Sequence, residues 1–259
     1  MKIGFIGFGS MGRAIAEGLL ARNVCAPEDI YACAGHFDKL KETADKLGIH
    51  AERTAAEVAA KSDWIVPAVV PAILEDVLRP VLPEVQGRVV VSIVSGWDFA
   101  RYESFLMPGT HHISTIPNTP IAIGEGVLAC ESTHNLTEDE YRTFSAVFGK
   151  IALIVPVTAA QFGPAGTLGG CTPAFTAMYL EALGDAGVKY GLGRAAAYQV
   201  AAQVLIGTGK LYLESGLHPG ALKDGVCSPG GTTIRGVAEL EKRAFRGTVL
   251  AAVDAIEGK

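Results

Sequence analysis

Near the carboxyl end of the chain, a short stretch combines residue types that bind small anions. Residues 228–233 read Ser-Pro-Gly-Gly-Thr-Thr, and an amphipathic segment running toward Phe245 begins there. Glycines leave backbone N–H groups uncovered, and the first N–H groups of a helix point toward the same space. The stretch therefore predicts a pocket for a carboxylate or phosphate, in which the hydroxyls of Thr232 and Thr233 can also donate. The alternative is a plain glycine loop in which one of these threonines caps the helix.

The second chemical signal is a glycine motif at the start of the chain. Residues 2–6 favour a short β-strand, and a Gly-x-Gly-x-x-Gly pattern at residues 7–12 follows it directly before a helical pattern. Gly7 then allows a sharp turn, Gly9 lets a pyrophosphate approach the backbone, and Gly12 lets the helix pack on the strand. The motif predicts a dinucleotide site, with a purely structural turn as the alternative. The expected cofactor contacts in this turn are Gly7, Gly9, Ser10, Met11 and Gly12.

The end of the second strand, expected over residues 30–34, normally selects between NAD and NADP. NAD-binding proteins carry an acidic residue there, which bonds the 2′-hydroxyl of the ribose. Residues 30–37, which span this strand and its end, contain no acidic residue, and this argues against strict use of NAD. The sequence offers only His36 and Lys39 for a 2′-phosphate, because no arginine lies directly after this strand. A surface position for His36 is the alternative.

Alternating strand and helix patterns extend the N-terminal half into a doubly wound α/β sheet of the Rossmann type. Apolar runs typical of strands covered on both faces are expected at residues 2–6, 30–34, 64–70, 88–94, 111–116 and 151–155. Helices are expected between them, including residues 38–47, which Gly48 ends. Pro67 is unsuited to a central strand, so it should lie at a strand end, beside the expected cofactor contacts Ala68 and Val69.

A stiff loop follows the strand expected at residues 111–116. Pro117 and Pro120 fix its backbone, and loops after sheet strands lie where ligands bind. Asn118 is therefore a candidate cofactor contact, with a rigid turn that binds nothing as the alternative. His111 and His112 point to opposite sides of the strand and lack an evident carboxylate partner, so no metal site is expected.

The composition after Pro156 favours helices. Residues 161–170 are rich in glycine and contain a proline, so any helix there is expected to be broken or soft. A strong helix is expected over residues 173–190, capped by Thr172, and another over residues 194–215. Their small apolar residues are too numerous for a solvated surface, and a second copy of the chain would cover them.

The bulk properties limit the classes of protein that fit. The 259 residues are expected to form a Rossmann domain at residues 1–156 and a helical domain at residues 157–259. A net charge of −5 without any run of Lys or Arg argues against nucleic acid as a partner. Five scattered cysteines form neither a disulfide framework nor a zinc motif. The first apolar run breaks into glycines too early for a signal peptide, and no run could span a membrane, so a cytoplasmic protein is expected.

Taken together, the N-terminal glycine turn, Pro-Asn-Thr-Pro at residues 117–120 and the segment 218–234 resemble the pyrroline-5-carboxylate reductase family. The resemblance covers roughly residues 2–255, and Ser-Pro-Gly-Gly-Thr-Thr is its most specific part. It implies a Rossmann domain joined to a helical domain that interlocks in a homodimer. It also implies reduction of 1-pyrroline-5-carboxylate to L-proline with NAD(P)H, the last step of proline biosynthesis. The alternatives are a reductase of a related cyclic imine acid and a non-catalytic NAD(P)-binding relative.

The resemblance also implies roles for single residues. Thr233 would stand near the imine nitrogen as the catalytic residue. The residues implied to bind the substrate carboxylate are Ser228, Gly230, Gly231, Thr232 and Thr233.

The chain departs from the family pattern at four places. Val70 and Ala72 stand where Lys and Gln are usual, and residues 34–36 read Ala-Gly-His in place of Asn-Arg-Ser. Ala55 replaces an expected Asn, and residues 169–173 read Gly-Gly-Cys-Thr-Pro in place of Ser-Gly-Ser-Gly-Pro. The first three changes concern the cofactor side and the last concerns the substrate side.

The choice of cofactor gives the first testable prediction. Counting His36 and Lys39 alone, we expect a preference for NADPH over NADH of about tenfold or less, or ~1.4 kcal/mol. Because histidine loses its charge between about pH 6 and 8, the preference should shrink over that range if His36 contributes. The measurement is the ratio of kcat/KM for the two cofactors against pH, with His36→Ala alongside. A ratio that does not change with pH would show that His36 has no part in the choice.

Overall fold

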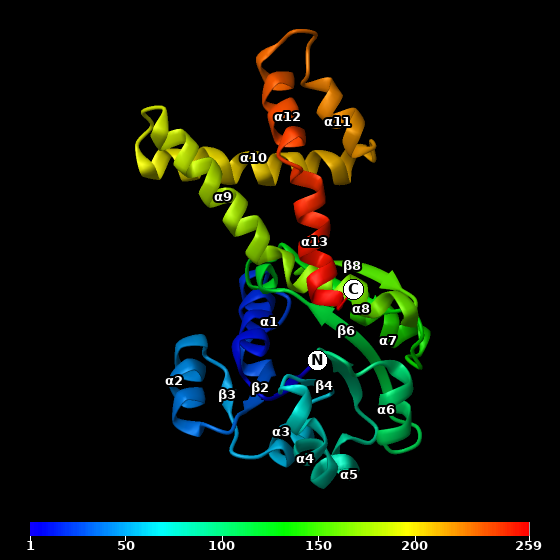
Figure 1. Ribbon diagram of the computed structural model, residues 1–259. Helices are drawn as coiled ribbons and strands as arrows, with labels where there is room; N and C mark the ends of the chain where they lie inside the picture. The colour runs from blue at the N-terminus through cyan, green and yellow to red at the C-terminus, as the bar shows by residue number, and fades with distance from the viewer. Residues whose placement is uncertain (259) are drawn as a thin grey trace. The chain divides into compact units, whose positions relative to one another are not determined.

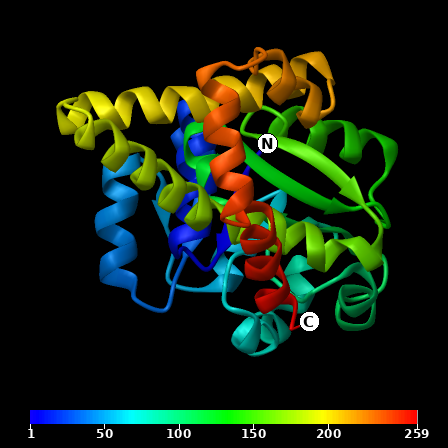
Figure 2. The same ribbon diagram turned by 45° about the horizontal axis from the view of Figure 1, so that its top comes forward.

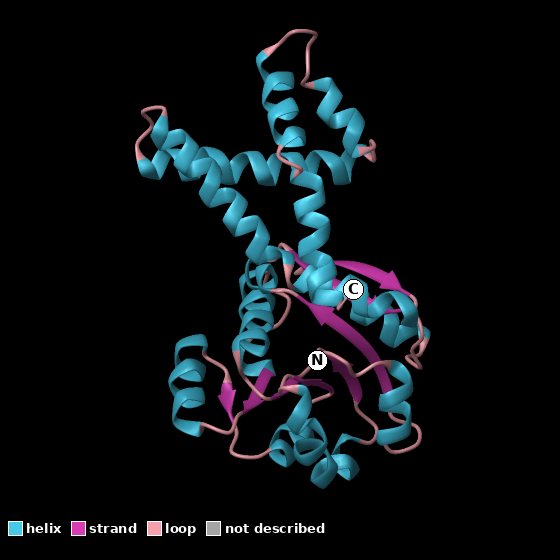
Figure 3. Cartoon of the chain, in the orientation of Figure 1, coloured by secondary structure: helices cyan, strands magenta, loops and turns pink. Residues whose placement is uncertain are grey.

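The computed structural model describes residues 1–258, which divide into two compact units between Gly170 and Cys171. Within the described residues, strands occur only in the first unit, and the second is built from helices (Figure 3). The division lies later than the expected boundary after Pro156. The reason is that helix α8 (Ala159–Gly170) packs on strands of the first unit.

The first unit contains, within residues 1–258, an eight-stranded sheet with the order β3-β2-β1-β4-β5-β6-β7-β8 (Figure 1). Strands β1 to β6 are parallel, and the strand order reverses between β1 and β4, as in a doubly wound fold. The strands are β1 (Ile3–Ile6), β2 (Ile30–Cys33), β3 (His50–Ala51), β4 (Trp64–Pro67), β5 (Val89–Ser92), β6 (His111–Pro117), β7 (Gly126–Glu131) and β8 (Ala152–Val157). Pro67 ends β4, as predicted.

The sequence patterns did not predict β7, which pairs antiparallel with β6. Strand β8 is parallel to β7, so these last two strands run against the other six. Figures 1 and 2 show this edge of the sheet, with β6 and β8 in green. The sheet is therefore a parallel Rossmann core extended by a reversed pair of strands.

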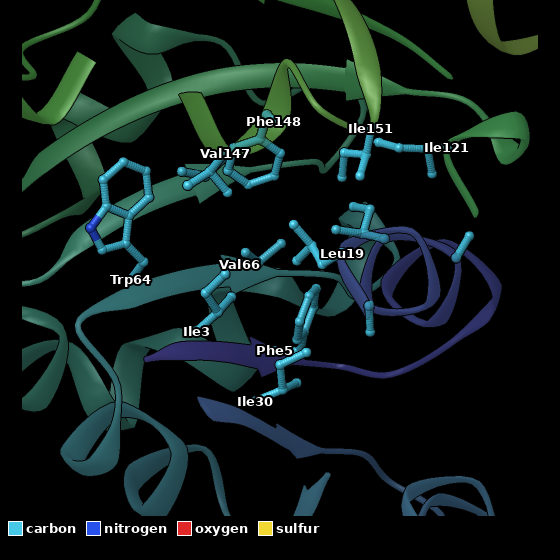
Figure 4. Packing of buried hydrophobic residues seen from close by; sticks show 14 of the residues in the cluster. Ile3, Phe5, Leu19, Ile30, Trp64, Val66, Ile121, Val147, Phe148 and Ile151 are labelled. Atoms are coloured by element: carbon cyan, nitrogen blue, oxygen red, sulfur yellow. The ribbon is translucent and has the colours of Figure 1, made fainter. Parts of the chain in front are cut away.

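Helices cover both faces of the parallel strands, because neighbouring residues on a strand point to opposite sides. Phe5 belongs to one buried cluster with residues of α1, α2 and α7, and Ile6 to a second with residues of α3 to α6. Figure 4 shows Phe5 and Leu19 within the first cluster. The helices are α1 (Ser10–Ala21), α2 (Phe37–Leu47), α3 (Ala55–Lys61), α4 (Leu74–Leu78), α5 (Leu82–Val85), α6 (Phe99–Phe105) and α7 (Glu138–Phe148).

The two adjacent histidines of β6 do have carboxylate partners, contrary to expectation. His111 Nδ1 lies 2.8 Å from Glu140 of α7, and His112 Nε2 lies 2.9 Å from Glu103 of α6. Burial lowers the pKa of His112, although Glu103 opposes that effect. The carboxylates come from two different helices, so these contacts connect β6 to α6 and to α7.

Helix α8 is continuous, although its glycines and Pro164 predicted a helix that is broken or soft. Its packing against β6, β7 and β8 explains the difference, because tertiary contacts override weak intrinsic propensity. Phe162 is buried, and Gly166 lies so close to Ile116 that a Cβ would come within 2.5 Å of its side chain.

The second unit contains α9 (Thr172–Lys189), α10 (Arg194–Ser215), α11 (Pro219–Gly225), α12 (Thr232–Lys242) and α13 (Phe245–Glu257). Gly216 ends α10 in the left-handed conformation, as predicted, but Cys171 rather than Thr172 is the N-cap of α9. Small residues let α9 and α10 approach closely, since a Cβ on Gly184 would lie 2.3 Å from the Tyr198 ring.

The second unit leaves large apolar side chains exposed. Met178, Val200 and Val204 have exposed fractions of 69%, 58% and 54%. Solvated helices rarely present such faces to water. Within the described residues, every helix is too short or too polar to span a bilayer.

Candidate functional site

A cleft of about 590 Å³ lies in the first unit where β1, β2 and β4 end. Parallel α/β sheets bind nucleotides at this position, because strand order reverses there and the connecting loops separate. Its lining residues are Gly7, Phe8, Gly9, Ser10, Arg13, Ala34, Gly35, His36, Lys39, Leu40, Thr43, Ala68, Val69, Val70 and Ile73.

The three motif glycines have the geometry that a dinucleotide requires. Gly7 has a φ of +94°, and a Cβ there would lie 2.5 Å from the carbonyl oxygen of Ala68. A Cβ on Gly12 would lie 3.2 Å from the Ala68 Cβ, whereas nothing lies within 4 Å of a Cβ on Gly9. Gly7 and Gly12 are therefore needed for packing, and Gly9 leaves space above the backbone.

Helix α1 begins in this cleft, and no side chain caps the backbone N–H groups of its first turn. Its N-cap Gly9 has no side chain to accept from them, and its first turn contains no acidic residue. These N–H groups and the helix dipole can bind the pyrophosphate of a dinucleotide.

The structure separates the predicted cofactor contacts into two groups. Those that line the cleft are Gly7, Gly9, Ser10, His36, Ala68 and Val69. Met11 packs against the first buried cluster, and Gly12 is buried beneath the turn.

Asn118 was expected to contact the cofactor but does not line the cleft. Its side-chain amide donates to the carbonyl oxygen of Gly169 at 3.0 Å. Its side-chain oxygen accepts from the backbone N–H of Val127 at 2.8 Å. The side chain therefore joins α8 and β7 to the loop after β6, which is a structural role.

The charge of the cleft lining is one-sided. Arg13, His36 and Lys39 can carry positive charge, and no Asp or Glu lines the cleft within the described residues. The sequence pattern at the end of β2 pointed only to His36 and Lys39, whereas Arg13 reaches the same cleft from α1. Helical spacing could have found it, because Arg13 follows Ser10 by one turn of α1.

The second candidate site is the glycine-rich turn that precedes α12, in the second unit. The N–H of Gly231 donates to the carbonyl oxygen of Ser228 at 3.0 Å. Pro229 lies at the second turn position and Gly230, with a φ of +70°, at the third, as in a type II turn. This turn delivers the chain to the helix start at Thr232.

The start of α12 has no side-chain cap. Its N-cap is Gly231, so the alternative in which Thr232 or Thr233 caps the helix is wrong. Both threonines are exposed, and the first turn of α12 contains no acidic residue. Backbone N–H groups and two hydroxyls are therefore together at a positive helix end, an arrangement suited to a carboxylate.

Comparison with known proteins decides the family. Residues 159–259 match the model described as pyrroline-5-carboxylate reductase dimerisation, and residues 2–96 match NADP oxidoreductase coenzyme F420-dependent. The pyrroline-5-carboxylate reductase of Treponema pallidum (strain Nichols) is 44% identical, with 98% of each chain covered. The chain belongs to the pyrroline-5-carboxylate reductase family. It is accordingly an NAD(P)H-dependent oxidoreductase, as the resemblance implied.

Other members of the pyrroline-5-carboxylate reductase family agree over nearly the whole chain. The Escherichia coli (strain K12) reductase is 37% identical, covering 97% of this chain and 94% of the relative. The crystal structure of Plasmodium falciparum pyrroline carboxylate reductase with NADP bound has a TM-score of 0.86 at 30% identity. That comparison covers 98% of this chain and 95% of the other, so the predicted fold class is confirmed for both domains.

The contrast between two motif glycines gives a prediction. Gly9→Ala should change the free energy of unfolding by about 1 kcal/mol or less, because its φ of −79° suits alanine and its surroundings are open. Its added methyl group should nevertheless weaken NADPH binding by obstructing the pyrophosphate. Gly7→Ala should destabilise the fold by more than about 2 kcal/mol, because it adds a clash to an unfavourable φ. Chemical denaturation and NADPH titration separate the two effects, and equal stability losses would contradict the assignment.

Proposed function

We propose that this protein reduces 1-pyrroline-5-carboxylate to L-proline, with NADPH as the preferred hydride donor. The single observation that carries the proposal is the uncapped start of α12 behind the Ser228–Gly231 turn, in a chain that also has the dinucleotide cleft. The first can bind a substrate carboxylate and the second a dinucleotide. A reductase of an imine acid needs both.

The proposed substrate anchor is formed by the turn and the first residues of α12. The backbone amides at Gly230, Thr232 and Thr233 and the hydroxyls of Ser228, Thr232 and Thr233 can surround a carboxylate, while the N–H of Gly231 closes the turn onto Ser228. Hydrogen bonds to a charged acceptor are the strong ones, so a few such donors suffice to orient a small ring. The anchor fixes the imine carbon in place, and positioning is the main requirement of this reaction.

The reduction of a C=N bond also needs a proton at nitrogen. A cyclic imine is closer to protonation than a ketone, so a hydroxyl that hydrogen-bonds the nitrogen and passes on a proton taken from water is enough, and a His–Asp pair is unnecessary. We assign this role to Thr233, the second residue of α12. NADPH, when bound in the cleft of the first unit, supplies the hydride.

Residues 169–173 are the reason why the proposal includes a second candidate substrate. Gly-Gly-Cys-Thr-Pro lies at the junction of α8 and α9 and differs from the family pattern on the substrate side. A related cyclic imine acid of different ring size or substitution would use the same carboxylate anchor. Spectroscopic measurement of NADPH consumption with 1-pyrroline-5-carboxylate, and with its six-membered analogue, decides between the two. The absence of turnover with either compound would favour the non-catalytic relative.

The proposed setting is a cytoplasmic homodimer that binds no nucleic acid. The negative net charge argues against nucleic acid as a partner, and the exposed apolar faces of α9 and α10 support the homodimer. Cell fractionation tests the location.

We predict that Thr233→Ala lowers kcat more than it weakens NADPH binding. Losing one donor that acts chiefly in the transition state costs about 2–4 kcal/mol, which corresponds to roughly a 30- to 1000-fold loss. Thr143→Ala is the matched control, because Thr143 is an exposed threonine of α7 outside both sites. Steady-state kinetics and NADPH titration are the measurements. Unchanged kinetics in Thr233→Ala would remove this residue from the mechanism.

A further prediction concerns assembly. The wild-type protein should sediment as at least a dimer at low micromolar concentration, because the apolar faces of α9 and α10 need cover. Val204→Glu should shift the protein toward the monomer and lower activity. Ile123→Glu, at an exposed position of the first unit, is the control and should leave the sedimentation coefficient unchanged. A stable and active wild-type monomer would refute the proposal.

A further inference from the structure

We propose that Arg13 selects NADPH over NADH by binding the 2′-phosphate of the adenosine ribose. This inference rests on the proposed function, which makes NADPH the preferred donor, and it names the residue responsible for that preference. Arg13 lies in the second turn of α1 and lines the dinucleotide cleft.

The position of Arg13 in the cleft places it on the ribose side. Ser10 and Arg13 are one helical turn apart and both line the cleft, so this stripe of α1 forms one wall. Gly35, His36 and Lys39, which follow β2, line the same cleft. In Rossmann sites the adenosine ribose lies over the end of β2, so a 2′-phosphate would lie between these two walls.

The charges around the cleft favour a dianion at that position. Neither His36 nor Lys39 has an ion-pair partner within the described residues, and no carboxylate lines the cleft there. Arg13 differs from both in chemistry, because a planar guanidinium can donate two parallel hydrogen bonds to one phosphate. It is therefore the lining residue best able to distinguish a phosphate from a hydroxyl.

The present partner of Arg13 does not prevent this role. Arg13 Nε lies 2.7 Å from Glu17 Oε1, a pair whose side chains have exposed fractions of 57% and 31%. Such exposed pairs one turn apart on a helix are weak. The two Nη groups make no hydrogen bond within residues 1–258, so they remain available while Nε holds Glu17. The contact with Glu17 keeps the guanidinium close to α1, at the wall of the cleft.

A third basic group in the cleft raises the expected preference for NADPH over NADH. His36 and Lys39 alone led to an expected preference of about tenfold or less. With Arg13, the wild-type preference for NADPH should exceed about tenfold, because a bidentate charged contact adds to theirs.

The test measures binding of adenosine 2′,5′-bisphosphate and adenosine 5′-monophosphate to the full chain by calorimetry. These two probes differ only in the 2′-phosphate, so the ratio of their affinities reports its recognition. Arg13→Gln should lower that ratio about tenfold, as expected for loss of a charged bidentate contact. Arg142→Gln, at an exposed surface arginine of α7, should leave the ratio unchanged.

Glu17→Gln separates recognition from a merely structural role. If the loss in Arg13→Gln came from breaking the Arg13–Glu17 pair, Glu17→Gln would show the same loss. The proposal requires that Glu17→Gln does not lower the ratio. Should Arg13→Gln fail to fold, Arg13→Lys keeps the charge and should lower the ratio about threefold, because it loses the fork.

The outcomes separate this inference from the proposed function, because the assay contains no imine and requires no turnover. An Arg13→Gln protein whose ratio stays within about twofold of the wild type would overturn the assignment, even if the protein reduces 1-pyrroline-5-carboxylate. A tenfold fall in the ratio would support it, even if another imine acid proved to be the substrate.

Discussion

The close contact between the turn after β1 and the end of β4 is the constraint on which the cofactor site depends. Gly7 lies against the carbonyl group of Ala68 in a backbone conformation that side chains disfavour. This contact fixes where α1 begins, and Gly12 then sets how closely the helix lies over the same strand end. The cleft, the free amides of α1 and the stripe that carries Arg13 all follow from that fixed starting point.

Short-range patterns explain what the sequence could predict. The glycine motif, the buried parallel strands and the ends of α2 and α10 are set by neighbouring residues, and the structure shows each of them. The glycine-rich turn at residues 228–231 is likewise set by neighbouring residues, because Pro229 and Gly230 together specify a type II turn. Family membership followed from the same residues.

Features that depend on distant contacts could not be predicted in the same way. Strand β7 forms at the reversed edge of the sheet, and α8 stays helical despite Pro164 because it packs on that edge. The hydrogen bonds of Asn118 could not be predicted, because its two partners, Gly169 and Val127, are brought to it only by folding. Arg13 was overlooked because the cleft combines one face of α1 with the loop after β2, which are separate in sequence.

The uncapped start of α12 has a consequence for how long the protein survives in a cell. A helix with a glycine N-cap, whose first amides lack a side-chain acceptor, is a few tenths of a kcal/mol less stable than one capped by Ser, Thr, Asn or Asp. A bound carboxylate would act as the missing cap, so the substrate would complete the helix as well as react beside it. A ligand that binds only the folded protein stabilises it more as the ligand concentration rises, and a gain of about 1–2 kcal/mol alters protein abundance severalfold, because unfolded chains are degraded. Through this helix, the supply of substrate would help to set the amount of enzyme that consumes it.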